Sequence, residues 1–482
     1  MSRALLAVAA ILALPASVAA QLEFRGSLES DLRLKIPLYD RQSAFKNAPF
    51  ERSETSLDGR INWRLNDHVG LFANARLYFT ERADPETFGG LTNRQLLEPW
   101  RLESDGAFVE FLDVGLDGLD LRFGRQAMVW GTADKFHPTA NLVSFDFTDP
   151  VKFGKPLANE MLALRYRPEL SVGTYGKDDN AIFSELALEL VWVPLFKPGQ
   201  LPNSAGLAFT DDAEFARRAN TPLLQRLVTQ QRFAAQGGYT FTYNPVVELP
   251  EFSGANSQVG ARLGWKLFNV DMSLSYYRGY DKIPRAEKVI AVKDGPTHVS
   301  SDIHLSYPRV HVLGIDVSTS LDFLDGLGLW AEVGLTWHDD LFRLVDAGTP
   351  FDIREIEKEH EQGMFVKSTV GMDYTPFPWW YINVQYVYGF PDEFGATSMK
   401  HYLVAGMDFK LARDMLLLRT FTVVHLTGDD ASAVLFPQIV VTPWNGGEIS
   451  VGAFLFLGSE SSKFGSAVTG APTVFMKAKA SF

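Results

Sequence analysis

The chain has 482 residues, a formal net charge of −13 at pH 7 and no cysteine. Without cysteine it has no disulfide framework, no thiolate catalysis and no lipid-modified N-terminal cysteine. The acidic balance argues against nucleic acid as a partner. After the first twenty residues, no window holds the eighteen or so uninterrupted apolar residues that a transmembrane helix needs.

The first twenty residues have the pattern of a secretory signal peptide. Arg3 supplies a positive start, residues 4–14 form an apolar run, and small residues end the segment at Ala20. We therefore expect a signal peptide over residues 1–20, followed by a single domain over residues 21–482.

Directly after this signal, residues 21–37 alternate between apolar and charged side chains. Even-numbered positions such as Phe24 and Leu28 are apolar, and odd-numbered positions such as Asp31 and Arg33 are charged. A period of two places the two sets on opposite faces of a strand, whereas a helical period would scatter both around its axis. This segment alone also fits an edge strand of a soluble sandwich, but the pattern recurs to the last residue.

The same alternation, bounded by turn residues, predicts a series of further strands. They are expected at Ser53–Leu65, Val69–Arg82, Ala107–Phe111, Leu119–Val129, Met161–Arg167, Glu185–Val193, Val259–Leu267, Val270–Tyr276, Ile315–Leu321, Leu329–Trp337, Val366–Tyr374, Trp380–Tyr388, Tyr402–Leu411, Met415–Leu426, Val434–Val441, Ile449–Leu457 and Val474–Phe482. The connections mostly alternate between short and long. This predicts an all-β fold, a transmembrane antiparallel β-barrel of about 18 strands (16–18), with periplasmic termini and long extracellular loops.

The C-terminal sequence FMKAKASF supports this fold. Met476 and Phe482 share an apolar face, while Lys477 and Lys479 share the other. A last strand that ends in phenylalanine resembles the assembly signal of Gram-negative outer-membrane barrels. The resemblance implies an outer-membrane location, Phe482 as the assembly signal, and the barrel-assembly machinery, outer-membrane lipid and lipopolysaccharide as partners.

A second motif comprises Phe123-Gly124-Arg125-Gln126, then Trp130-Gly131, then residues 137–142, HPTANL. It resembles the GRQ…WG…NP segment of large porin-like proteins related to alginate-export and substrate-porin barrels. The chain departs from that pattern in having His137-Pro138 in place of Asn-Pro. Trp130, His137 and Asn141 become candidates for a loop that folds over the pore.

Arg125 conflicts with simple alternation, because it has the parity of lipid-facing Phe123. A charge at mid-membrane depth costs roughly 2–4 kcal/mol. Either Arg125 lies at the rim, or a β-bulge at Gly124 reverses the parity. We favour the bulge.

If the last strand pairs with the first, many charged side chains share one inward-facing sector. The basic candidates are Arg25, Arg33, Lys35, Arg60, Arg64, Arg76, Arg122, Lys477 and Lys479, and the acidic ones are Glu23, Glu29, Asp31, Asp58 and Glu110. Two interpretations remain open. The sector is a mutually neutralised polar wall, which we favour, or a basic ladder that tunes ion selectivity.

Two long connections have distinct character. In residues 194–256, Asp211-Asp212 and Thr221-Pro222 are typical helix starts. We expect this insertion to cap the rim; the alternatives are folding into the lumen and contact with a partner protein. Residues 339–361 hold eight acids against three bases and should repel anions at the outer mouth. The acidic pairs of the connections, Asp178-Asp179, Asp211-Asp212, Asp339-Asp340 and Asp429-Asp430, fit solvated loop charge better than bridging cations.

No residue pattern points to catalysis, a metal or a cofactor. His298, His304 and His311, for example, lack the spacing of a zinc site. The sequence therefore favours a passive, porin-like channel for small solutes. One alternative is a non-transporting barrel that anchors a secretion, polymer-export or motility machine through periplasmic or envelope-complex proteins. The less favoured alternative is an outer-membrane lipid-modifying enzyme.

Overall fold

The structure is a computed structural model that describes residues 22–36, 50–80, 83, 87–149, 153–175, 180–428 and 431–482. The expected signal peptide lies outside the described residues, as do the pairs Asp178-Asp179 and Asp429-Asp430. None of the helices in the described ranges is long and apolar enough to cross a membrane.

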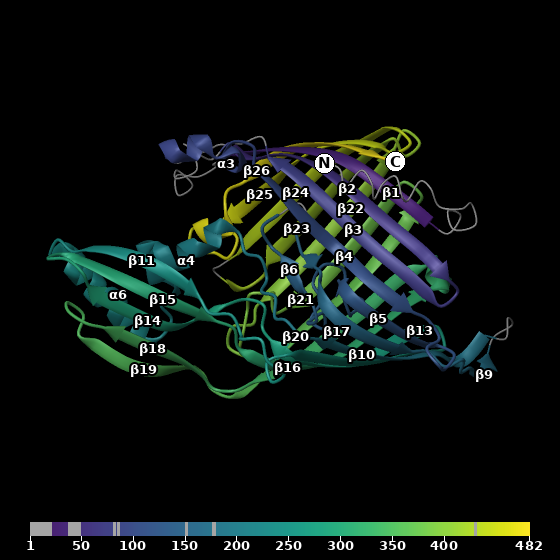
Figure 1. The fold of residues 1–482 in the computed structure, drawn as a ribbon, viewed down its shortest axis with the longest axis horizontal. Helices are drawn as coiled ribbons and strands as arrows, with labels where there is room; N and C mark the ends of the chain where they lie inside the picture. Colours follow the sequence, from purple (N-terminus) through teal and green to yellow (C-terminus); the bar gives the residue numbers. More distant parts are fainter. Residues whose placement is uncertain are drawn as a thin grey trace.

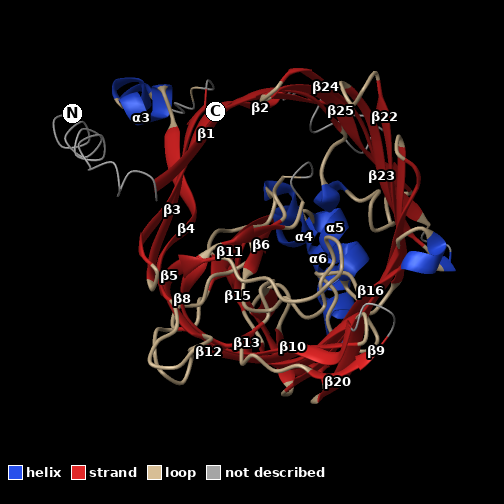
Figure 2. Cartoon of the chain, turned by 90° about the vertical axis from the view of Figure 1, so that its right-hand side faces the viewer, coloured by secondary structure: helices blue, strands red, loops and turns tan. Residues whose placement is uncertain are grey.

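Eighteen antiparallel strands form a closed barrel, seen end-on as a ring in Figure 2, and this confirms the predicted fold class. The barrel strands are β1 (Leu22–Lys35), β2 (Phe50–Asn66), β3 (Val69–Thr80), β4 (Trp100–Phe111), β5 (Leu119–Gln126), β8 (Asn159–Tyr166), β10 (Asn180–Val193), β12 (Gln258–Leu267), β13 (Val270–Tyr280), β16 (Arg309–Leu321), β17 (Leu327–His338), β20 (Gly363–Phe377), β21 (Trp380–Tyr388), β22 (His401–Leu411), β23 (Leu416–His425), β24 (Ser432–Trp444), β25 (Gly447–Gly458) and β26 (Thr473–Ser481). The ring closes where β26 pairs with β1, from Ser27 opposite Ser481 to Lys35 opposite Thr473.

The period of two separates an apolar outer face from a polar inner one on β1. Phe24 and Leu28 are 59% and 46% exposed on the outside, whereas Asp31 and Arg33 on the inside are buried. Because the barrel is closed, every strand has a hydrogen-bonded neighbour on both sides. The backbone N–H and C=O groups of the wall therefore find their partners within the sheet rather than in water. β4 and β16 begin at Trp100 and Arg309, earlier than predicted. On β16 the apolar pattern is interrupted on the outer face, where Arg309 and His311 share the parity of exposed Ile315.

Leu22, the first described residue of β1, lies at the same end of the barrel as the C-terminal Phe482 and the tight turns. The turn after β2 is held by the Asn66 side chain, whose Oδ1 accepts the amides of His68 and Val69 at 2.9 and 2.8 Å. The turns after β12 and β24 contain Phe268 and Gly446 at positive φ, as tight hairpins require. The other long connections leave from the opposite end, as the alternation of short and long predicts. The exception is the connection after β8, because its strand β9 (Val172–Tyr175) pairs with the start of β10 at the end with the tight turns.

Three of the long connections build a cap at this outer end, on the left in Figure 1. Its five-stranded sheet has the order β11 (Thr240–Val247), β15 (His298–Ser306), β14 (Arg285–Lys293), β18 (Leu341–Ala347) and β19 (Ile353–His360). The pairs β11–β15 and β14–β18 are parallel, which joins connections far apart in sequence. The alternation of the barrel strands did not predict this sheet. Within this sheet, the acidic stretch at residues 339–361 forms the antiparallel hairpin of β18 and β19. In that hairpin Arg343 Nη1 lies 3.0 Å from Glu357 Oε1.

Three helices of the 194–256 insertion belong to this cap, α4 (Leu207–Thr210), α5 (Asp212–Arg218) and α6 (Pro222–Gln236). The Asp211 side chain accepts the amides of Ala213 and Glu214, and the Thr221 side chain accepts that of Leu224, so both predicted helix starts are confirmed. The apolar stripe of α6 packs on one face of the sheet. The insertion lies at the outer end of the barrel, where we expected a rim cap.

The predicted bulge at Gly124 is wrong. β5 pairs with β4 and with β8 in continuous register, with Arg125 opposite Glu160. Arg125 keeps the outward parity of Phe123, one residue from the end of β5, and its Nη1 lies 3.0 Å from Glu160 Oε1. A paired charge at the rim avoids the cost of mid-membrane burial, so no reversal of parity is needed. The bulge of this region lies between β3 and β4 instead, at Asn74–Arg76.

The terminal residue completes the seam between the last strand and the first. Phe482 exchanges two backbone hydrogen bonds with Gly26, at 2.8 and 2.9 Å. The Phe482 ring lies over Gly26, where a Cβ would come within 2.3 Å of it. Glycine at this position therefore leaves room for the terminal ring.

We predict that deletion of Phe482 prevents assembly, because closure then loses both hydrogen bonds and the ring contact. The measurement is the amount of protein in the outer membrane that migrates faster unheated than boiled on a denaturing gel. Phe323→Ala is the matched control, since Phe323 is 80% exposed on the turn η5 (Asp322–Leu324) at the same end. Normal levels of the Phe482-deleted protein would contradict this role.

Candidate functional site

The connection between β5 and β8 folds into the barrel. We call its described residues, 127–149 and 153–158, the inserted segment. It contains the short strands β6 (Ser144–Asp146) and β7 (Lys155–Leu157), and Figure 2 shows β6 inside the ring. Loops usually lie on protein surfaces because buried backbone polar groups need partners. The partners of this segment therefore determine the shape of the lumen.

The strongest anchor is the Glu332 carboxylate on the inner face of β17. Its side chain is fully buried, and its two oxygens accept the amides of Thr132, Ala133 and Thr139 at 3.1, 3.1 and 2.7 Å. The Thr139 hydroxyl donates a fourth hydrogen bond at 2.7 Å. The segment curls around one carboxylate that would otherwise be costly to bury. Gly131, at φ +103°, is required because a Cβ there would lie 2.4 Å from Glu332.

The motif residues hold the same curl to the wall. The Trp130 indole is buried and donates to Glu189 Oε2 on β10 at 2.9 Å, and its ring fills the space above Gly260. Asn141 Nδ2 donates to the Pro138 carbonyl at 3.1 Å. His137 Nδ1 lies 3.5 Å from Glu332 Oε2. The three sequence candidates thus belong to the inserted segment, where they contact the segment itself or the barrel wall.

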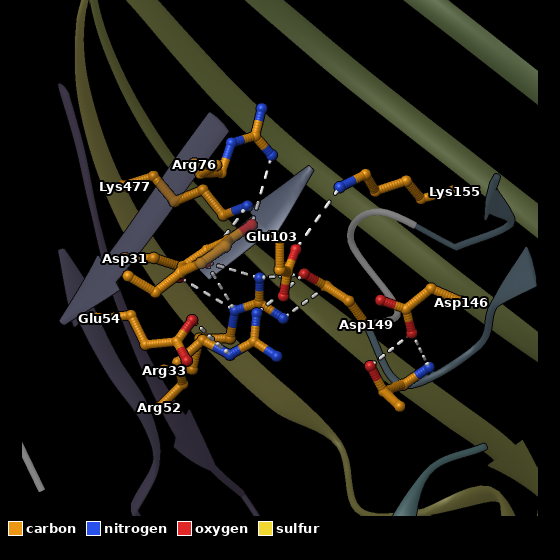
Figure 3. A network of polar contacts seen from close by, with 12 residues as sticks. Asp31, Arg33, Arg52, Glu54, Arg76, Glu103, Asp146, Asp149, Lys155 and Lys477 are labelled. Atoms are coloured by element: carbon orange, nitrogen blue, oxygen red, sulfur yellow. Dashed lines mark hydrogen bonds and ion pairs between the residues drawn. The ribbon is translucent and has the colours of Figure 1, made fainter. Parts of the chain in front are cut away.

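The far end of the segment is tied to the opposite wall through Asp149, as Figure 3 shows. Asp149 accepts from Arg33 Nη1 and Nη2 at 2.6 and 2.9 Å and from Arg52 Nη1 at 3.0 Å. Arg33 also pairs with Asp31 at 2.6 Å. Burial alone would raise the pKa of Asp149, but hydrogen bonds and attraction from Arg33 outweigh it and hold that pKa below its usual range. Arg33 therefore anchors the segment.

The remaining charged candidates are mostly paired with acids across or along the strands. Arg25 pairs with Glu23 at an exposed site near the N-terminal end of β1. The other ion pairs are Lys35–Glu51 at 2.9 Å, Arg76–Asp58 at 2.7 Å, Arg122–Glu110 at 3.0 Å and Lys477–Asp31 at 3.4 Å. Arg60 faces Arg25 in the strand register, Arg64 faces Gly70, and Lys479 faces both Glu29 and Glu448. Most bases of this sector thus have an acid as ion-pair partner or cross-strand neighbour, whereas Arg60 lies opposite Arg25.

A cavity of about 1490 Å³ lies within the barrel beside the inserted segment. Of the charged residues predicted to line the lumen, Glu29, Lys35, Lys477 and Lys479 border this cavity. Sequence reasoning missed its aromatic border, which includes inward-facing Phe436, Phe454 and Phe456. The sequence does indicate these inward-facing phenylalanines, because in runs such as Ala453–Leu457 the residues of both strand faces are apolar.

A scan of protein-family profiles and a search of curated proteins gave no match. Among solved structures, OccAB3 and OccAB2 of Acinetobacter baumannii each align with a TM-score of 0.50 and 8% identity. The alignments cover 96% and 97% of this chain and 99% of each other chain. The outer membrane protein OpdK of Pseudomonas aeruginosa aligns at a TM-score of 0.48 and 9% identity, over 96% of this chain and 99% of that one. At such identities the likeness to OccAB3 and OccAB2 concerns the fold.

We predict that Glu332→Gln loosens the inserted segment. The new amide group presents donors to backbone amides that need an acceptor, and each unmet buried group costs about 1–3 kcal/mol. Current through single channels should become larger and noisier. Thr139→Val, which removes one donor, should show a weaker form of the effect, and Thr139→Ser should behave like the unchanged protein. Identical currents in all three variants would show that this anchor does not shape the lumen.

We also predict that the Asp149 tether fails in acid. Because the folded pKa lies below the ordinary value of about 3.9, its stabilisation is complete above that pH and is lost as the pH falls below it. Conductance should therefore stay constant between about pH 4 and 8 and rise only as the pH falls further, toward the lowered pKa of Asp149. Asp149→Asn should show the raised conductance already at neutral pH. Asp146→Asn is the control, since the Asp146 side chain accepts hydrogen bonds from the Thr148 amide and hydroxyl, within the segment itself.

Proposed function

We propose that the protein is a passive, non-enzymatic outer-membrane channel for small solutes. The supporting observation is the cavity beside an inserted segment that is held to opposite walls. Barrels of 16–18 strands leave an aqueous channel unless something fills it. A volume of about 1490 Å³ exceeds the 300–1,000 Å³ of most ligand pockets, so a small solute has room to enter.

The outer surface supports the membrane location. Along β25 the outward positions carry Ile449, Val451 and Leu455, while the inward positions carry Glu448 and Ser450. At the end with the tight turns, Phe377, Trp379 and Phe409 form a stacked aromatic group, as expected where a barrel meets the membrane interface. We propose lipid and lipopolysaccharide as the surroundings of this surface, and the barrel-assembly machinery as the partner that recognises Phe482.

Of the two interpretations of the charged sector, we favour a mutually neutralised polar wall over a basic ladder that selects anions. Arg33 is buried between Asp31 and Asp149, and most of the other bases face an acid. Residual charge in a water-filled space is further screened over about 8 Å at physiological salt. The channel should therefore discriminate weakly between small anions and cations.

We predict stable, voltage-independent ion currents after reconstitution of the purified protein in planar bilayers, with a reversal potential close to zero in a salt gradient. Liposomes that contain it should admit small sugars faster than trisaccharides, since the inserted segment narrows the lumen. A silent barrel that co-purifies with periplasmic proteins would instead support the anchoring alternative. Heat-modifiable migration must first show that the reconstituted protein is folded.

A further inference from the structure

One part of the lumen wall is apolar, contrary to the rule for a water-filled barrel. The inner faces of β22 to β25 carry Val404, Val423, Phe436, Phe454 and Phe456, all of them buried. These positions lie toward the outer ends of their strands, because β25 runs outward from Gly447 and β24 runs inward from Ser432. Inward positions of a channel are normally polar. We call this patch the apolar band.

The inserted segment and a neighbouring loop contribute further rings beside this band. Phe136 lies 6.0 Å from Phe153 and 5.1 Å from Phe390, measured between ring centroids. All three rings border the same cavity as Phe454 and Phe456. Packing of the segment against the wall buries most of these rings, but Phe153 and Phe421 are only partly buried and keep surface on the cavity.

The wall changes character toward the periplasmic end. On β25, Glu448 lies six positions before Phe454, a separation of roughly 20 Å along the strand. Glu448 faces Lys479, and Arg419 holds Asp408 through two hydrogen bonds at 2.8 and 2.6 Å. The charged side chains that border the whole cavity include nearly equal numbers of acids and bases. The lumen wall therefore presents apolar side chains to a solute toward the outer end and ion-paired side chains toward the periplasmic end.

We propose that the lumen binds and passes neutral amphipathic solutes, molecules with an aromatic or alicyclic body and a hydroxyl or amide group. The apolar band removes the body from water, which contributes about 25 cal/mol per Å² of buried apolar surface. The ion-paired region offers hydrogen-bond donors and acceptors to the polar group. A solute with net charge gains no matching counter-charge, because the charges present already neutralise one another. This inference rests on the proposed channel function.

The test uses 2-phenylethanol as the probe on single channels of the full-length protein in planar bilayers. Transient, saturable blocks of the ion current are expected with 2-phenylethanol, and not with sorbitol or with the charged analogue phenylacetate. Phe454→Gln combined with Phe456→Gln should weaken the block about tenfold, since each loses apolar contact area. Phe88→Gln is the matched control, because Phe88 is 84% exposed on the outer turn η2 (Phe88–Thr92).

Folding of each variant is verified by heat-modifiable migration, and Phe421→Gln replaces the double variant if that one fails to fold. Phe421 borders the cavity on β23 and is only partly buried. A channel that conducts ions but is blocked equally by sorbitol or phenylacetate, or whose block survives the Phe→Gln changes, overturns the inference and leaves the channel function intact. A protein without any current overturns the channel function, and this inference with it.

Discussion

The arrangement of the lumen depends on one buried carboxylate. Glu332 lies in the barrel wall with no exposed surface, and its charge is acceptable there only because four donors from the inserted segment surround it. The requirement acts in both directions, since those backbone amides also need an acceptor inside the protein. Gly131 and Trp130 are then fixed by the close approach of the segment to β17 and β10.

A second anchor at Asp149 fixes the other end of the inserted segment, so that the segment spans the lumen between two opposite walls. Arg33 and Arg52 hold this end on the wall formed by β1 and β2, away from β17. Two fixed ends leave a cavity beside the segment instead of a packed plug. Beyond it, the cap of α4–α6 and the five-stranded sheet stands over part of the outer opening, as Figures 1 and 2 show together.

The sequence was sufficient for the barrel because its signal is local. Alternation on each strand, turn residues such as Asn66 and helix starts such as Thr221-Pro222 depend only on neighbouring residues. Closure between β26 and β1 was expected from the barrel fold, and it brings the side chains of Lys477 and Asp31, both predicted to face inward, to 3.4 Å from each other. The alternation also assigned Arg125 correctly to the outer face. The predicted bulge was wrong, because an ion pair with Glu160 at the rim already explains how a charge is accommodated on that face.

The features that the sequence did not reveal are those formed between distant segments. Glu332 lies about 200 positions from the amides that it binds, and nothing local distinguishes it from other inward acids. The cap sheet depends on parallel pairing of β14 with β18 and of β11 with β15, strands from separate connections. In the sequence, the apolar band shows only as strands whose two faces are both apolar. Alternation alone cannot tell which of those faces points into the lumen.

Amide hydrogen exchange of the unaltered protein tests the central claim most directly, because it reports on the Glu332 anchor without any mutation. If the carboxylate binds the inserted segment as described, the amides of Thr132, Ala133 and Thr139 should be protected to the same degree as those of β17 itself. The amide of Gly254, in the exposed part of an outer connection, should exchange rapidly in the same sample. Exchange of the three amides at the rate of Gly254 would contradict the account.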